Sequence, residues 1–528
     1  MPDLPYRIVV GLETHVQLST RTKLFCGCST AFGLPPNSAT CPVCIGMPGT
    51  LPVMNRQAFQ LALRAAAALN CTIAGFTKWD RKNYWYPDLP KNYQISQYDL
   101  PFSADGHLDV ETAAGARRIG IIRVHLEEDA GKLLHDEKGT GGDSLVDLNR
   151  AGTPLLEIVS QPDIATPEEA KTYLEELRLL LRELGVSDCE MQEGSLRCDA
   201  NVNIHIPVTG RGLGGADHVA TPLVEVKNLN SFRSVERAIK YEAERQLDEY
   251  QSKIGFGTEW QRLGQPREFA RLGRLVDRVG TRKDGQFREV AKATAGWNDE
   301  RGVTIVQRHK EEAADYRYFP EPDLMPVVVT AAEQAEVRAG LGELPAAQRQ
   351  RLMTQYGLSA YDAEVISSQG RAFVAYFEEA ARVGGDAVEA KNWTTNEVLQ
   401  TLNEKKLAIG SFPLPAASLG GLIQEVKSTG LNTQRAREVY AAMLDGGSAK
   451  EAIAQLGIQV VADAGQLLEI VRKAIAANPK AVADFKKGKT KALGAIMGAV
   501  MRETKGMAKM ETVQQLVMEE LKNDGTAG

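Results

Sequence analysis

The stretch Ile8-Val-Val-Gly-Leu-Glu-Thr-His-Val-Gln-Leu18 decides the fold of the amino-terminal part of the chain, because apolar and polar residues alternate along it. Its apolar set is Ile8, Val10, Leu12, Val16 and Leu18, and its polar set is Glu13, His15 and Gln17. A period of two residues is typical of a β-strand with one buried and one polar face. We therefore predict a strand that presents a carboxylate, an imidazole and an amide on one face.

Three later segments repeat this chemistry at predicted strands or strand ends. They are His125-Leu-Glu-Glu-Asp, Leu155-Leu-Glu-Ile-Val and Arg197-Cys-Asp-Ala-Asn-Val-Asn. Carboxylates together with an imidazole suit Mg²⁺ and, through it, the phosphates of a nucleotide. A solvated strand face would explain any one segment alone. The four segments together favour a binding site.

The composition sets limits on the class of protein. A length of 528 residues is too great for one core and predicts several domains. With a net charge of −6, a nucleic-acid partner would have to meet a local basic patch. No apolar run approaches the ~20 residues that span a bilayer, and the first residues lack the apolar core of a signal peptide. We expect a cytoplasmic protein with no membrane partner.

A change in composition indicates the domain organisation. Residues 1–327 are rich in Gly, Pro, Asn, Asp and Tyr with short alternating runs, which predicts a sheet-based domain. Helices are expected within it from Thr166-Pro-Glu-Glu onward and from Ser231 to Tyr250, and the proline-rich stretch from Asp315 to Pro326 closes it. Residues 328–412 and 413–528 have helical periodicity, with Phe412-Pro-Leu-Pro as the seam between two helical modules. The predicted fold class is α+β.

Four cysteines lie at the spacing of a zinc site. Cys26-x-Cys28 is followed, after twelve residues, by Cys41-x-x-Cys44. Two close thiolate pairs can close a tetrahedral four-sulfur site, which is structural because no position remains for a substrate. Free buried thiols are the alternative interpretation. The isolated cysteines, which are Cys71, Cys189 and Cys198, are expected to be small core residues.

A family resemblance emerges when a basic, aromatic loop is added to these segments. The loop Arg81-Lys-Asn-Tyr-Trp-Tyr-Pro-Asp-Leu-Pro-Lys-Asn-Tyr-Gln-Ile-Ser-Gln-Tyr-Asp suits stacking and phosphate contact. With it, the motifs beginning at Gly11, His125, Leu145, Glu193 and Glu225 closely resemble the B subunits of aspartyl/glutamyl-tRNA amidotransferases, the GatB family. The resemblance runs the whole chain, because Phe485-Lys-Lys-Gly-Lys-Thr-Lys-Ala-Leu-Gly resembles the YqeY-type tail of that family.

The resemblance implies an enzyme that works as a heterotrimer. The A subunit would hydrolyse glutamine and send ammonia through a channel, and the C subunit would tie A to B. The B subunit would use ATP and Mg²⁺ to phosphorylate the side-chain carboxylate of Glu-tRNA(Gln) or Asp-tRNA(Asn), and ammonia would displace the phosphate. Residues 1–327 would then be the catalytic cradle domain with a structural Zn²⁺ knuckle, 328–412 a helical domain, and 413–528 a tail that contacts tRNA.

The matching motifs also imply roles for individual residues. Glu13, His15 and Glu128 resemble the Mg²⁺ ligands, and Glu157 and Asp199 would line the same cavity. Lys82, Asn83 and Tyr84 would contact ATP, with Lys82 facing either phosphate or the substrate carboxylate. The alternation from Ile119 to Leu126 points instead to Glu127, so either the strand ends early or Glu127 is the ligand. The family pattern favours Glu128.

The lysines of the tail are the expected tRNA contacts. They are Lys486, Lys487, Lys489, Lys491 and Lys505. Between them, an apolar stripe at Leu493, Ile496, Met497, Val500 and Met501 should pack inward. Two alternatives stay open: an ATP-dependent ligase of a free small carboxylate, and a non-catalytic RNA-binding scaffold.

Overall fold

The computed structural model describes residues 6–134, 144–207, 218–254, 293–309, 316–458, 464–486, 492–504 and 510–523. The chain divides into two compact units, Met1–Leu344 and Pro345–Gly528. Among the helices of these described residues, none combines the length and the apolar character that crossing a membrane requires.

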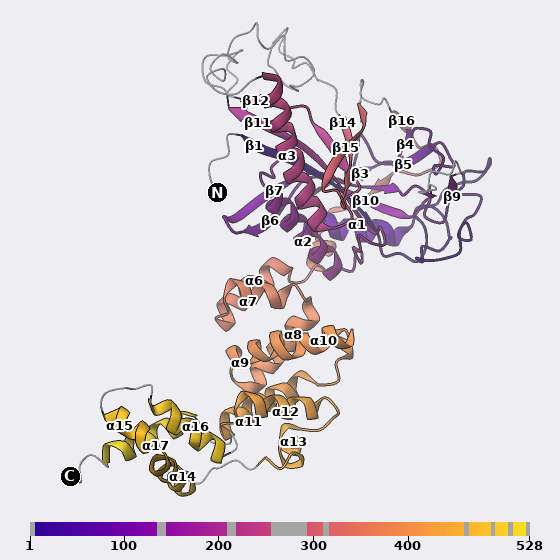
Figure 1. Cartoon of the computed structure of the whole chain (residues 1–528). Coiled ribbons are helices and arrows are strands. Elements are labelled where there is room, and N and C mark those ends of the chain that lie inside the picture. Colours follow the sequence, from indigo (N-terminus) through magenta and orange to yellow (C-terminus); the bar gives the residue numbers. More distant parts are fainter. Residues whose placement is uncertain are drawn as a thin grey trace. The chain divides into compact units, whose positions relative to one another are not determined.

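A large mixed sheet forms the first unit (Figure 1). Its strand order is β15-β14-β13-β11-β1-β10-β7-β6-β2, with β12 paired to β11. The bounds are β1 Arg7–Gln17, β2 Thr72–Ile73, β6 Ser103–Thr112, β7 Gly115–Glu128, β10 Pro154–Ser160, β11 Leu196–Pro207, β12 His218–Ala220, β13 Val224–Lys227, β14 Ala293–Asn298 and β15 Val303–His309. The β13–β14 pair is parallel and the other pairs are antiparallel.

The predicted strand is β1, at the centre of this sheet. Val10, Leu12 and Val16 are fully buried, whereas Glu13 and His15 on the other face are only partly buried. Three helices contribute to the core on the apolar side, namely α1 (Arg56–Ala68), α2 (Pro167–Glu183) and α3 (Phe232–Ile254). The expected helix starts are confirmed: the Thr166 hydroxyl accepts from the Glu169 amide at 3.0 Å, and α3 covers the second predicted segment.

The described residues of the first unit also form three smaller sheets. The one that matters for the site, hereafter the small sheet, has the order β16-β4-β5, with β16 at Arg317–Pro320, β4 at Asp80–Asn83 and β5 at Tyr93–Ser96. The other two pair β17 (Val327–Val328) with β3 (Phe76–Thr77) and β8 (Lys132–Leu134) with β9 (Leu145–Asp147). Helix α5 (Ala331–Ala339) ends the unit, capped by Thr330.

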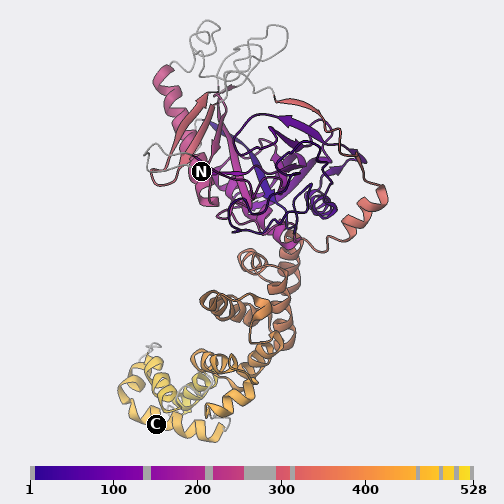
Figure 2. The same cartoon turned by 90° about the vertical axis from the view of Figure 1, so that its right-hand side faces the viewer.

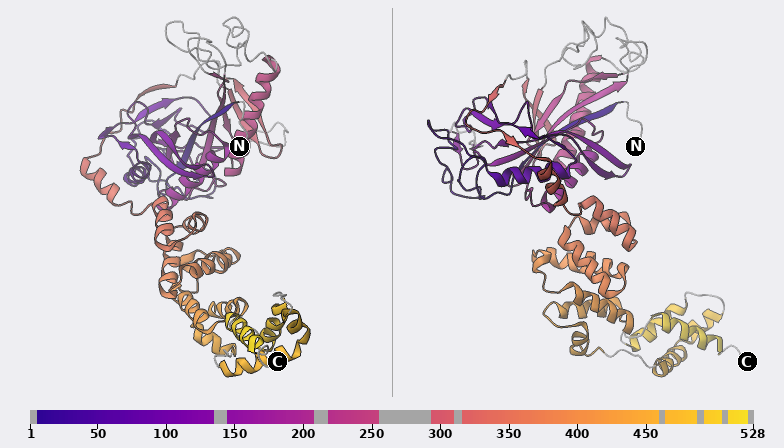
Figure 3. Two further views of the ribbon diagram at one scale, coloured as in Figure 1. Left: turned by 90° about the vertical axis from the view of Figure 1, so that its left-hand side faces the viewer. Right: turned by 180° about the vertical axis from the view of Figure 1, so that it is seen from behind.

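The described part of the second unit consists of helices and their connections (Figures 2 and 3). They are α6 Pro345–Tyr356, α7 Ala360–Ser367, α8 Arg371–Gly384, α9 Ala387–Asn392, the π-helix η4 Trp393–Val398, α10 Leu399–Lys405, the short η5 Ile409–Ser411, α11 Ala416–Thr429, α12 Thr433–Met443, α13 Ala449–Gln455, α14 Ala464–Ala477, α15 Pro479–Lys486, α16 Leu493–Glu503 and α17 Met510–Asn523. The predicted α+β class, with a sheet domain followed by helices, is confirmed.

The described residues of the helical unit form two apolar cores. One runs from Leu352 to Ile458, across the predicted seam at Phe412, and the other from Leu467 to Leu521. The second core contains the predicted apolar stripe, with Leu493, Ile496 and Val500 buried and the two methionines packed against them. The boundaries 1–327, 328–412 and 413–528 stay predictions.

Candidate functional site

The register of the large sheet brings two histidines and two carboxylates together. His15 on β1 lies opposite Glu157 on β10, and Glu157 lies opposite His125 on β7. Glu127, two residues after His125, is on the same face. His125 Nε2 is 3.1 Å from a Glu157 oxygen, and each histidine Nε2 is 3.8 Å from a Glu127 oxygen. The period-two pattern of the sequence therefore produces a compact site.

Three members of this set could hold a metal ion. One ligand atom each from His15, Glu127 and Glu157 lie within 4.8 Å of one another. An imidazole nitrogen and two carboxylates are a donor set that fits Mg²⁺ or a first-row divalent metal. We call these three residues the acidic site.

The charges of the acidic site stabilise each other. Burial by itself would lower the pKa of His125, but Glu157 and Glu127 raise this pKa to about 9. Burial would raise the pKa of Glu157, but the charge and hydrogen bond of His125 lower it well below its usual range. Burial would likewise raise the pKa of Glu127, but the hydrogen bond of His125 and the charge of Lys82 lower it overall. The carboxylates are therefore ionised and suited to a cation.

Glu128 lies in different surroundings from Glu127. It pairs with Pro154, and its carboxylate accepts from the Ile95 amide at 3.0 Å and contacts the Lys91 ammonium. Strand β7 continues through residue 128, so alternation places only Glu127 with His125. The choice of Glu128 as an Mg²⁺ ligand stays a prediction, and the geometry favours Glu127.

Glu13 belongs to an adjoining polar cluster on the same sheet. It lies opposite Asp199 and accepts from Asn201 Nδ2 at 2.8 Å. Burial, followed by the charge of Glu157, raises the pKa of Glu13. Lys227 pairs with Asp199 and, at 2.8 Å, with Glu225. The sequence motifs contained Asn201, Glu225 and Lys227, but their position on this face followed only from the pairing of β11 with β1 and with β13.

The small sheet carries Lys82 on one face and Asn83 on the other. The Lys82 ammonium lies 5.2 Å from the centre of the Tyr316 ring and 5.9 Å from that of Tyr84. Burial would lower the pKa of Lys82, but Glu127 and other charges raise it overall. Asn83 instead donates to the carbonyl of Arg81 at 3.1 Å and to that of Arg317.

Two tyrosines of this face were not predicted as site residues. Tyr318 lies opposite Lys82 in the small sheet, and its ring stacks on that of Tyr98 at 3.9 Å. Tyr316 makes an edge contact with Tyr84 at 5.6 Å. The available signal was the Tyr-x-Tyr alternation before Pro320, but it did not identify β4 as the partner strand.

The cysteine cluster comes together as the spacing predicted. The sulfur atoms of Cys26, Cys28, Cys41 and Cys44 lie within 4.8 Å of one another. Four thiols in this arrangement fit a structural zinc ion.

A buried cation supports the cluster. Lys23 is fully buried, with its ammonium 3.5 Å from the Cys44 sulfur and 3.4 Å from the Leu148 carbonyl oxygen. A hydrogen bond with Cys26, aided by the charge of Lys23, lowers the pKa of Cys44 to about 4. Cys71, Cys189 and Cys198 are buried in the apolar core, as predicted.

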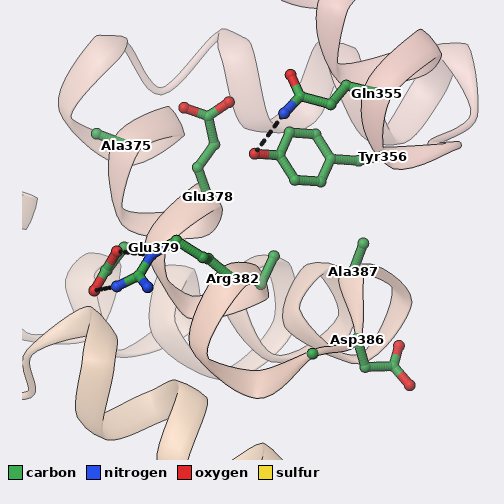
Figure 4. Close-up of a pocket in the computed structure, with 10 residues that line it drawn as sticks. Gln355, Tyr356, Ala375, Glu378, Glu379, Arg382, Asp386 and Ala387 are labelled. Atoms are coloured by element: carbon green, nitrogen blue, oxygen red, sulfur yellow. Dashed lines mark hydrogen bonds and ion pairs between the residues drawn. The ribbon is translucent and has the colours of Figure 1, made fainter.

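A separate hollow lies in the helical unit (Figure 4). Its volume is about 550 Å³, and α6, α8 and the turn before α9 provide its walls. Gln355 donates to Tyr356 at 3.5 Å, and Arg382 pairs with Glu379 at 2.6 Å. Among the described residues that line it, none is a predicted site residue.

The predicted tRNA contacts fall mostly outside the described residues. Lys487, Lys489, Lys491 and Lys505 lie there, and Lys486 ends α15 with a side chain that is not described.

The fold and the site define a class: an α+β protein with a carboxylate–histidine site on its sheet, a four-cysteine cluster and a helical second unit. Two family models match, the GatB/GatE catalytic domain at residues 8–335 and the GatB domain at residues 375–521. The chain belongs to the GatB family, the B subunits of aspartyl/glutamyl-tRNA(Asn/Gln) amidotransferases.

Curated relatives match over nearly their whole length. The chain is 49% identical to the B subunit of the aspartyl/glutamyl-tRNA(Asn/Gln) amidotransferase of Rhodopirellula baltica, with 98% of this chain and 97% of the relative covered. The protein of the same name from Caldanaerobacter subterraneus subsp. tengcongensis is 46% identical, with 98% and 100% covered. That of Carboxydothermus hydrogenoformans is 44% identical, with 98% and 99% covered. The resemblance expected from the motifs is confirmed.

Proposed function

We propose that the chain uses ATP to activate the side-chain carboxylate of Glu-tRNA(Gln), Asp-tRNA(Asn) or both, and that ammonia then converts the activated carboxylate into an amide. The γ-phosphoryl group of ATP bonds to a carboxylate oxygen, which gives an acyl phosphate and ADP. Ammonia then attacks the carbonyl carbon, inorganic phosphate leaves with the bonding electrons, and an amide remains. Activation is needed because an ionised carboxylate is a poor electrophile at neutral pH.

The observation that carries this proposal is the acidic site beside the small sheet that carries Lys82, where Ser96 of β5 donates to Glu127 at 3.4 Å. Mg²⁺ held by His15, Glu127 and Glu157 would neutralise charge on the transferred phosphoryl group. Lys82 adds a fixed positive charge, and Tyr84 offers a ring beside it. Glu13 and Asp199, which lie opposite each other on β1 and β11, would add carboxylates beside this site. Catalysis would then consist of positioning and charge compensation, as phosphoryl transfer requires.

The remaining assignments complete the proposed complex. Ammonia would come from the glutamine-hydrolysing A subunit, the C subunit would join the two proteins, and the four cysteines would hold a structural Zn²⁺ ion. The tail lysines would contact tRNA through its phosphates, which gives affinity without taking part in the chemistry.

Phosphate release from ATP by the assembled complex tests the proposal. We expect release that depends on mischarged tRNA and stops when uncharged tRNA replaces it. Release driven by free glutamate or aspartate would indicate a ligase of small carboxylates. Tight tRNA binding without phosphate release would indicate a scaffold.

A further inference from the structure

The Lys82 ammonium lies close to the acidic site without being paired to it. Lys82 on β4 lies opposite Gln94 on β5, and β5 is joined to the end of β7: Gln94 donates to the Glu128 carbonyl at 2.6 Å and Ser96 donates to Glu127 Oε2 at 3.4 Å. Yet within the part of the chain that the structure describes, Lys82 forms no ion pair with a carboxylate, and its contacts are with the Tyr84 and Tyr316 rings. A flexible ammonium near two carboxylates would ordinarily swing onto one of them. Among the described residues the Lys82 ammonium is not paired in this way, so other contacts hold it.

The two rings supply a physical reason. The negative face of an aromatic ring attracts a cation within about 6 Å of its centre. Tyr316 and Tyr84 meet this condition at 5.2 and 5.9 Å, and their rings contact each other edge to face with a 72° angle. The cation is therefore held from two directions, while its three N–H donors are not committed to a carboxylate.

The rings are themselves fixed by the small sheet. Tyr84 donates a hydrogen bond to Gln94 Oε1 at 3.3 Å, and the Gln94 amide donates to the Glu128 carbonyl at 2.6 Å. Tyr316 immediately precedes β16, whose next tyrosine, Tyr318, lies opposite Lys82 and stacks on Tyr98. The strand that brings Tyr316 to Lys82 is thus anchored on the same face.

We propose that Tyr84 and Tyr316 are positioning residues that hold the Lys82 ammonium clear of the carboxylates, so that its donors meet the transferred phosphoryl group. The inference rests on the proposed function, in which Lys82 contacts that group. Neither ring takes a proton or touches the reacting atoms in this proposal. Tyr316 acts only through Lys82, and Tyr84 holds Lys82 in addition to its predicted contact with ATP.

A double-mutant cycle in the complete heterotrimer tests this. Tyr316→Leu, Lys82→Met and the double variant are compared by kcat and KM for ATP in the amidation of Glu-tRNA(Gln), with ammonium chloride as the nitrogen source. We expect Tyr316→Leu to lower kcat/KM for ATP by about two- to thirty-fold, the range of one cation–π contact. In the Lys82→Met background the same substitution should have almost no further effect, because the cation it acts through is gone.

Matched variants separate positioning from folding. Tyr316→Phe keeps the ring face and should lose less activity than Tyr316→Leu. Phe319 lies on the opposite face of the same strand, 5.8 Å from Arg81, and is 45% exposed, so Phe319→Leu removes a ring from β16 without touching Lys82. Phe319→Leu should leave the ATP kinetics unchanged. If Tyr316→Leu prevents folding, Tyr316→Met carries the same cycle.

Two results would overturn the inference. One is an equal loss from Tyr316→Leu with and without Lys82, and the other is a loss in Phe319→Leu as large as in Tyr316→Leu. Neither result would contradict the proposed function if Glu127→Gln and Glu157→Gln abolish phosphoryl transfer. Normal transfer in both of those variants would instead count against the proposed function itself.

Discussion

Glu157 is the central residue of the acidic site, because it lies opposite His15 on one neighbouring strand and His125 on the other. The family motifs predicted that Glu157 lies near His15, whereas period-two alternation places a side chain on a face but does not identify the partner strand. It also pointed to Glu127 over Glu128, and the family pattern pointed the other way. Tyr316 and Tyr318 could not be found in this manner, because they reach Lys82 only through the pairing of β16 with β4.

The two adjacent glutamates give a first prediction. Glu127→Gln should lower the rate of ATP-dependent carboxylate activation by about a hundredfold or more, because it removes a ligand charge from the acidic site. Glu128→Gln should spare metal affinity, since its carboxylate contacts Lys91 and the Ile95 amide. Mg²⁺ titration of activity in both variants makes the comparison. A rise in the Mg²⁺ requirement confined to Glu128→Gln would restore Glu128 as the ligand.

Asp129 gives a second prediction, about stability. Its buried carboxylate accepts from Gln17 and Arg197, each at 2.8 Å, and although burial opposes ionisation, Arg197 and Arg150 lower its pKa. Asp129→Asn should lower the free energy of unfolding by about 3 kcal/mol. This is the low end of the range for a broken buried ion pair, because the Arg197 side chain is 34% exposed and water can solvate its charge.

The pH dependence checks the sign of this effect. Because the pKa of Asp129 is lower in the folded than in the unfolded protein, its carboxylate stabilises the folded state fully at pH values above the ordinary pKa of about 3.9. This contribution is lost as the pH falls through the folded-state pKa. The difference in stability between the unsubstituted protein and the Asp129→Asn variant should therefore be full at neutral pH and vanish in acid. Hydrogen exchange of β1 and β7 amides measures it. Equal protection in both proteins at neutral pH would contradict the assignment.

At the scale of elements, the cysteine cluster lies in loops, and we expect a bound metal to stabilise it more than apolar packing does. Sequence spacing predicted the four ligands correctly as neighbours, because thiol pairs close in sequence need only one loop closure to meet. It did not predict the buried Lys23, because a lysine is normally a surface residue.

Loss of one cysteine gives a third prediction. Cys41→Ser should reduce bound zinc, measured by elemental analysis, from one per chain to nearly none, and should lower the melting temperature of the first unit, because metal binding is coupled to folding. Cys71→Ser is the control, since this buried thiol lies outside the cluster. Protein purified without chelator that contains no zinc would contradict the site, as would an unchanged melting temperature in Cys41→Ser.

At the scale of the whole molecule, the order of sheet domain and helices follows from the change in composition, which a sequence displays directly. The boundaries of the helical cores do not follow from composition, because a Phe-Pro-Leu-Pro segment can lie inside one core as easily as between two cores. Leu414 is buried there, and the Tyr376 hydroxyl donates to its carbonyl at 2.9 Å.

Removal of the last core gives a fourth prediction. Deleting residues 459–528 leaves the core from Leu352 to Ile458 intact and removes the one from Leu467 to Leu521. The KM for mischarged tRNA should rise by about tenfold or more, with a weaker salt dependence, because phosphate contacts are lost. Glutamine hydrolysis by the complex should persist at its basal rate. Unchanged KM and unchanged salt dependence would show that the tail lysines are solvated surface.

The central claim is that the acidic site performs phosphoryl transfer, and a single-turnover experiment on Glu157→Gln tests it most directly. The complex is mixed with γ-labelled ATP and Glu-tRNA(Gln) without any nitrogen donor, and label on the tRNA-linked carboxylate is followed. We predict a rate at least about a hundredfold lower than in the unsubstituted complex. Glu190→Gln, which removes a carboxylate paired to Arg178, should behave like the unsubstituted protein. A normal rate in Glu157→Gln would contradict the claim.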